Sequence, residues 1–157
     1  MTYRIVLAGL LLCLVPSLGT AGEEMSPEAE EVAATLDRLN KASDKKDIDG
    51  VMALVAPDAV FMGTGPGERW EGEEIIREAY GQFFGSSDKE VAELTWRKVG
   101  VHGDVAWAAG MLNVTSYLRN YKKQFPLNVS VVLMKQDDGV WRIVQYHHSN
   151  PTSADPE

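Results

Sequence analysis

The sequence contains a single cysteine, Cys13, among 157 residues. This cysteine lies within the first 21 residues, which have the features of a cleavable leader, so a chain that begins after them has no cysteine. Disulfide bonds, a thiol nucleophile and zinc–thiolate sites are then excluded. The stability of such a chain must come from its hydrophobic core.

Basic residues are also scarce, with 15 Lys and Arg against 23 Asp and Glu, which gives a formal net charge of −8. Binding to nucleic acid or to an anionic membrane surface requires a concentrated surplus of Lys and Arg. We therefore predict no nucleic-acid partner, and the acidity is typical of a chain that is kept soluble by its charge. The apolar fraction of 45% and the charged fraction of 24% are those of an ordinary globular domain.

No apolar run reaches the roughly 20 residues that a membrane-spanning helix needs. The longest run, from Ile5 to Val15, follows the basic residue Arg4 and is broken by Pro16, and Gly19-Thr20-Ala21 then supplies small residues. This three-part arrangement is typical of a secretory signal peptide. We therefore expect residues 1–21 to be a signal peptide cut after Ala21, and the protein to be periplasmic or secreted without a stable membrane anchor.

The next part of the chain has mostly helical periodicity. Ser26-Pro27 is typical of a helix start, because serine caps the first turn and proline at the first helical position loses no hydrogen bond. Apolar residues then recur every three or four positions, which predicts helices separated by one short strand. The expected elements are a helix from 27 to about 43–46, a short helix over 48–55, a strand over 59–62, and a helix from 72 to about 85.

Beyond residue 90 the apolar period changes to two, which predicts β-strands. The expected strands cover 91–101, 105–117, 125–136 and 140–149, and the Asp138-Gly139 pair is typical of a hairpin turn. Helices followed by consecutive strands predict an α+β domain over 22–150, with three helices packed on a strongly bent antiparallel sheet and a disordered tail over 151–157. A space between the concave face of such a sheet and the helices can form a pocket.

Several short segments occur in an order that resembles a known family. They are Asp47 to Leu54, Pro57 to Phe61, Trp70-Glu71-Gly72, Gly103 to Trp107, Asp138 to Val144 and His147-His148-Ser149. Their order and spacing resemble those of SnoaL-like domains in the NTF2-like superfamily, over about Pro27 to Ser149. The resemblance implies a conical bent sheet with three helices, a deep pocket and frequent dimerisation through the sheet. Because relatives include isomerases, dehydratases, polyketide cyclases and oligomerisation modules, the resemblance implies no particular reaction.

The last strand supplies the candidate catalytic residue. Strict alternation places Trp141, Ile143, Gln145 and His147 on one face, and we assign this face to the concave side because its first two residues are strongly apolar. His147 would then point into the pocket, where an imidazole could act as a general acid or base or orient a ligand. A purely structural histidine, hydrogen-bonded to a neighbouring element, is the alternative.

The remaining candidate residues are a carboxylate and three aromatic residues. Asp58 follows a proline just before the first strand, where it could orient His147 or serve only in a turn. Tyr80, Trp96 and Tyr117 could line the pocket with aromatic faces, and Gln145 could supply a polar contact. Core packing is the alternative for the aromatic residues.

No cofactor or metal is expected. The glycine-rich segment 63–67 lacks the lysine and hydroxyl residue of a phosphate-binding loop. His147 and His148 are adjacent on a strand and would point apart, so they cannot bind one ion together. We therefore expect an exported, homodimeric pocket protein that binds a small and largely apolar molecule. The alternatives are a cofactor-independent lyase or isomerase that uses His147, and a homo-oligomerisation module.

Overall fold

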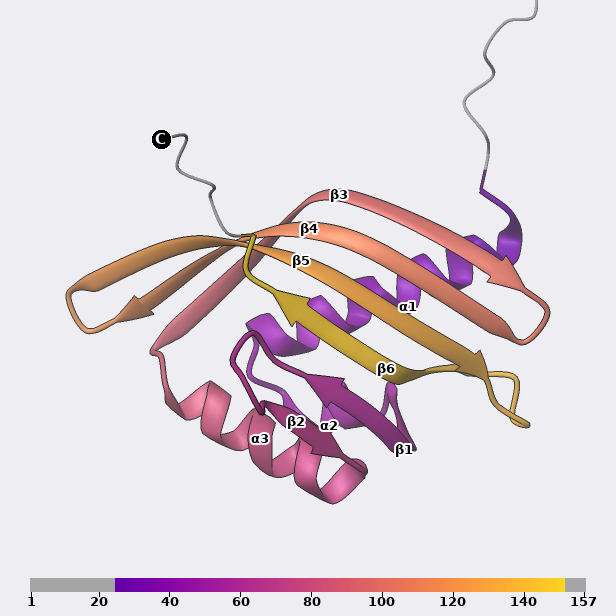
Figure 1. The fold of residues 1–157 in the computed structure, drawn as a ribbon, viewed down its shortest axis with the longest axis horizontal. Coiled ribbons are helices and arrows are strands. Elements are labelled where there is room, and N and C mark those ends of the chain that lie inside the picture. Colours follow the sequence, from indigo (N-terminus) through magenta and orange to yellow (C-terminus); the bar gives the residue numbers. More distant parts are fainter. Residues whose placement is uncertain (1–24, 152–157) are drawn as a thin grey trace, which may run out of the picture.

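The computed structural model describes residues 25–151, which form three helices and one six-stranded sheet (Figure 1). The expected signal peptide and residues 152–157 of the expected tail lie outside the described residues. The elements are α1 (Pro27–Asp44), α2 (Ile48–Met52), β1 (Val55–Met62), β2 (Arg69–Glu71), α3 (Glu73–Gly85), β3 (Lys89–His102), β4 (Val105–Leu118), β5 (Tyr121–Lys135) and β6 (Trp141–Ser149). No helix within 25–151 is long and apolar enough to span a membrane.

The sheet is mixed rather than antiparallel as predicted. Its strand order is β2-β1-β6-β5-β4-β3, and β1 runs parallel to β6 while the other neighbours are antiparallel. The α+β class and the bent sheet are as expected, but α3 follows two strands, so the helices do not all precede the sheet. Pairing between the first and last strands of a chain is a long-range contact that periodicity does not reveal.

The first strand is longer than predicted, since β1 begins at Val55 and contains Pro57. The register between β1 and β6 shifts between Val55 and Val60, so the proline lies where the ladder is interrupted and its missing N–H breaks no hydrogen bond there. Strand β2 has three residues and was not predicted. It pairs with the end of β1 and leads directly into α3.

The core lies between α1 and the concave face of the sheet. Side chains buried there include Val32, Leu36 and Leu39 of α1 and Leu133 and Ile143 of the sheet. Each fully buried aliphatic side chain stabilises the fold by about 1.5–3 kcal/mol relative to an exposed one.

Two polar contacts fix α1 on the sheet at both sides. Arg97 of β3 donates to the carboxylate of Asp37 at 2.6 Å and to the carbonyl of Ala33 at 3.3 Å. On the other side, the Trp141 indole of β6 donates to Glu31 Oε2 at 3.2 Å.

Figure 1 shows α1 running across the sheet, and α3 on the far side of β1 and β2 from β6. A cavity lies between α3, the end of α1 and the long strands.

Candidate functional site

A cavity of about 760 Å³ opens between α1, α3 and the concave face of the sheet. Its volume falls within the range of ligand pockets, roughly 300–1,000 Å³. Aromatic residues contribute from five elements, namely Phe61 of β1, Trp70 of β2, Tyr80, Phe83 and Phe84 of α3, Phe125 of β5 and Tyr146 of β6. Leu112, Val114 and Leu127 of the long strands add aliphatic surface. The cavity wall is therefore mostly apolar.

Five of these aromatic residues, Phe61, Tyr80, Phe83, Phe84 and Tyr146, form one connected cluster. Tyr80 meets Phe84 edge to face with ring centroids 5.4 Å apart, and it meets Phe61 at 6.2 Å. Phe61 in turn stacks on Tyr146, with centroids 5.1 Å apart and an interplanar angle of 25°. Such contacts hold the rings in fixed orientations. A ligand would therefore meet a preformed aromatic surface.

Two β-bulges decide which strand residues face this cavity. In β6 the register with β5 passes from Leu133↔Ile143 to Val132↔Gln145, so Val144 is an extra residue. The alternation of side chains therefore inverts after Ile143. Tyr146 and His148 face inward and line the cavity, whereas Gln145 and His147 face outward.

The predicted placement of His147 in the pocket is therefore wrong, and so is that of Gln145. The hypothesis of acid–base chemistry by His147 required that side chain to face the cavity. Asp58 is exposed and does not line the cavity, and within residues 25–151 no hydrogen bond or ion pair joins it to His147. The structure does not bring these two residues together as a catalytic pair.

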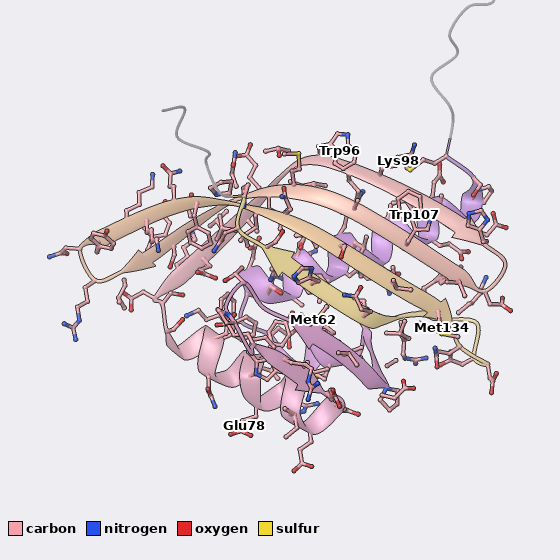
Figure 2. The ribbon with its side chains drawn as sticks, in the orientation of Figure 1. Met62, Glu78, Trp96, Lys98, Trp107 and Met134 are labelled. Carbon is pink, nitrogen blue, oxygen red and sulfur yellow. The ribbon has the colours of Figure 1, made fainter. Side chains whose placement is uncertain are left out.

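The second bulge lies in β3. Its register with β4 passes from Leu94↔Leu112 to Trp96↔Met111, so Thr95 is the extra residue. Trp96 therefore points away from the helices, and its side chain is 49% exposed (Figure 2). Tyr117 also lies on the outer face, because Leu112 and Val114 of the same strand face inward. The predicted cavity positions of Trp96 and Tyr117 are wrong for this reason.

Tyr80 is the one predicted ligand-binding residue that lines the cavity. Its phenol is buried, and burial raises its pKa well above the ordinary value of 10.0, opposed by a hydrogen bond with Ser43. Burial likewise raises the pKa of Tyr146, with a smaller contribution from Tyr80. Both phenols therefore stay protonated at neutral pH.

His148 lines the cavity, although strict alternation along the strand predicted that it points outward. Its Nε2 lies 2.9 Å from the Tyr146 hydroxyl, and burial, followed by the neighbouring His147, lowers its pKa from 6.5 to about 4. The imidazole is therefore neutral at pH 7. One sequence signal for this placement exists, because Ile143 and Val144 are two successive apolar residues and the next large apolar residue is Tyr146. That spacing indicates a change of phase within the strand.

Charged residues near the cavity are engaged by the protein itself. The Lys46 amine donates to the carbonyl of Phe84 at 2.6 Å and to that of Ser87, and Glu68 accepts from the Gly65 amide at 2.8 Å. Burial raises the pKa of Glu90, opposed first by a hydrogen bond with Ser116. Within residues 25–151, no three His, Cys, Asp or Glu side chains lie close enough to hold a metal ion.

The family model and the solved structures that match this chain indicate the same fold. A family model described as a SnoaL-like domain matches residues 32–153. An NTF2-like superfamily protein from Salmonella enterica is similar, with 25% identity, a TM-score of 0.73, and coverage of 82% of this chain and 96% of that one. An NTF2-like protein of unknown function from Pseudomonas putida has 21% identity, a TM-score of 0.73, and coverage of 84% and 93%.

A third similar structure comes from Xanthomonas campestris and is named as a candidate calcium/calmodulin-dependent protein kinase II association domain. It has 29% identity and a TM-score of 0.72, and the match covers 82% of this chain and 91% of that one. A search of curated proteins returns no match. The solved structures share the NTF2-like fold, an α+β arrangement in which this chain has three helices and a six-stranded mixed sheet.

Proposed function

This chain belongs to the SnoaL-like domain family, and from that premise we propose that it binds a small, largely apolar molecule in the cavity between α3 and the sheet. The observation that carries the proposal is the preformed aromatic and aliphatic wall of a space of about 760 Å³. Binding an apolar molecule there removes its surface from water, which favours the complex by roughly 25 cal/mol for each Å² buried. The neutral Tyr80 and His148 add hydrogen-bonding groups without the cost of burying charge.

Native mass spectrometry tests this proposal. The full sequence is expressed in a bacterial host and purified separately from the periplasmic and cytoplasmic fractions. The spectrum of the purified protein is recorded before and after addition of naphthalene. We expect either a co-purified small molecule or a saturable naphthalene adduct. Ala92 lines the cavity from β3, whereas its neighbour Val91 points outward. Ala92→Trp should weaken naphthalene binding because the indole fills part of the cavity, and the matched Val91→Trp should not. A chain that carries and binds nothing would refute the proposal.

The same spectrum tests a second proposal, that the protein is exported. The run from Ile5 to Val15 and the small residues Gly19-Thr20-Ala21 support it. Cleavage after Ala21 predicts a mature mass that begins at Gly22. A full-length chain retained in the cytoplasm would contradict export, and it would leave the binding proposal to be judged on the adduct alone.

We also propose that the chain forms a homodimer through the outer face of the sheet. An outer patch, defined as Trp96, Val105, Trp107, Met111 and Met134, supports this proposal because all five side chains are at least 39% exposed. They lie on the convex side, as Figure 2 shows for both tryptophans and Met134. Exposed apolar patches of this kind are typical of interaction surfaces. The similar protein from Xanthomonas campestris, named as an association domain, adds support.

A further inference from the structure

Inside the cavity, one hydrogen-bonded pair of polar side chains interrupts the apolar wall of β6. The hydroxyl of Tyr146 lies 2.9 Å from Nε2 of His148, and the two rings meet edge to face with centroids 4.7 Å apart. The Val144 bulge directs both side chains inward, and stacking on Phe61 fixes the Tyr146 ring. The pair is therefore held in place before any ligand arrives.

In either histidine tautomer, the pair leaves one hydrogen-bond donor and one acceptor unused. If the Tyr146 hydroxyl donates to Nε2, the Nδ1–H of His148 remains a donor and the phenol oxygen an acceptor. If Nε2–H donates instead, the phenol O–H remains a donor and Nδ1 an acceptor. Within residues 25–151, Nδ1 of His148 has no hydrogen-bond partner and remains accessible to solvent. One uncharged donor and one acceptor are therefore free for a ligand.

Several other polar residues of the lining already have protein partners. Lys46 bonds to two carbonyl groups at the end of α3, Glu68 bonds to the amide of Gly65, and the Lys123 amine lies 5.4 Å from the centre of the Phe125 ring. Tyr80 shares a hydrogen bond with Ser43. The Tyr146–His148 pair, by contrast, keeps a free donor and a free acceptor beside the aromatic cluster.

We propose that the ligand is an uncharged, planar, largely aromatic or alicyclic molecule with one ketone or hydroxyl oxygen, which hydrogen bonds to the Tyr146–His148 pair. This inference rests on the proposed function, because it names the class of molecule that the same cavity binds. A flat ring can pack against the aromatic surface that Phe61, Tyr80 and Phe84 form. A charged group placed at the pair would lose its hydration and would meet an uncharged imidazole and an uncharged phenol.

The protonation states of His148 and Tyr146 also favour an uncharged ligand. The lowered pKa of His148 keeps the imidazole uncharged at neutral pH, so it offers an anion no ion pair. The raised pKa of Tyr146 keeps its proton available as a donor.

Four probes of nearly equal size test the inference by isothermal titration calorimetry at pH 7. They are naphthalene, 2-acetylnaphthalene, 2-naphthol and 2-naphthoate. We expect the neutral ketone and the naphthol to bind about ten-fold more tightly than naphthalene, because each gains one hydrogen bond. We expect 2-naphthoate to bind at least ten-fold more weakly than the ketone, since its carboxylate must lose its hydration.

Variants identify the group that makes the hydrogen bond. Tyr146→Phe should lower the affinity for 2-acetylnaphthalene about ten-fold and leave naphthalene affinity within two-fold, which also shows that the variant is folded. His148→Phe gives an independent second variant with the same expected loss. His147→Phe is the matched control, because that neighbouring side chain faces outward and should change neither affinity.

The outcomes separate the two proposals. Naphthalene binding with no preference for the ketone, tight binding of 2-naphthoate, or an unchanged ketone affinity in both variants would overturn the neutral-oxygen inference and leave the apolar pocket standing. Failure of all four probes to bind would overturn both.

Discussion

At the scale of single residues, the buried position of His148 determines its protonation state. The side chain is mostly buried, its Nε2 contacts the Tyr146 hydroxyl, and His147 adjoins it on the other face of the strand. Burial is the largest cause of its lowered pKa, about 4 against 6.5, and the neighbouring histidine adds to it. The fold therefore favours the neutral imidazole, which links the stability of the protein to pH.

The sign of this linkage gives a prediction. Because the folded-state pKa of His148 lies below the unfolded value, the unfolded chain binds more protons between about pH 6.5 and 4. The contribution is fully present above pH 6.5 and is lost as the pH falls towards 4, by up to about 3 kcal/mol. Urea unfolding of His148→Gln should therefore show a shallower loss of stability in this window than the wild type does.

His147→Gln is the control for that measurement. This neighbour faces outward, and its removal leaves the burial that is the largest cause of the lowered His148 pKa, so the variant should keep most of the wild-type pH dependence. Parallel pH curves for the wild type and His148→Gln would contradict the neutral, buried state of His148.

At the scale of elements, Lys46 links the ends of two helices. It adopts a positive φ of 56° just after α1, and its amine donates to the carbonyls of Phe84 and Ser87 at the end of α3. A cation at this position satisfies carbonyl groups that the helix leaves unpaired and favours the negative end of its dipole. The contact holds α3 against α1 beside the cavity mouth.

Lys46→Met should therefore destabilise the protein by about 1–2 kcal/mol, because two partly buried carbonyls lose a charged donor. Urea unfolding monitored by circular dichroism measures the change. Lys45→Met is the matched control, since the adjacent Lys45 is exposed, and it should change the free energy of unfolding by less than about 0.5 kcal/mol. Equal effects of the two substitutions would show that the contact adds nothing to stability.

The elements also show how far a sequence predicts this fold and its site. Helical and period-two patterns predicted α1, α3 and the four long strands, because amphipathic periodicity follows directly from one-sided burial. Periodicity does not reveal a bulge, and the extra residues Thr95 and Val144 invert the faces that follow them. The α+β class could thus be predicted, while the parallel β1–β6 pairing could not, and Trp96 and His147 were assigned to the wrong face.

At the scale of the whole molecule, the Thr95 and Val144 bulges determine which side chains lie on the inner and outer faces of the sheet. The inner face of the sheet carries the cavity lining, and the outer face carries the outer patch. Gly100 contributes to the flatness of that patch, because a Cβ there would lie 2.5 Å from the Trp107 ring. The indole therefore covers the glycine and lies close to the sheet.

The proposed homodimer makes the outer patch the place to test. We expect the wild type to sediment as a dimer at micromolar concentration and Trp107→Glu to sediment as a monomer, because the interface would then have to bury an unpaired charge. Ile75→Glu is the matched control, since Ile75 is 46% exposed but lies on α3. A monomeric wild type, or dimers of both variants, would contradict dimerisation through this face.

The central claim is that an apolar ligand binds in the cavity faced by His148, and the histidine side chains report this directly. In ¹H–¹³C NMR spectra recorded during a naphthalene titration, we predict that the imidazole signals of His148 shift and saturate. The signals of His147, on the outer face, and of His102, at the β3–β4 turn, should stay in place. A shift of His147 with His148 unmoved, or no shift of any histidine at saturating naphthalene, would contradict the account.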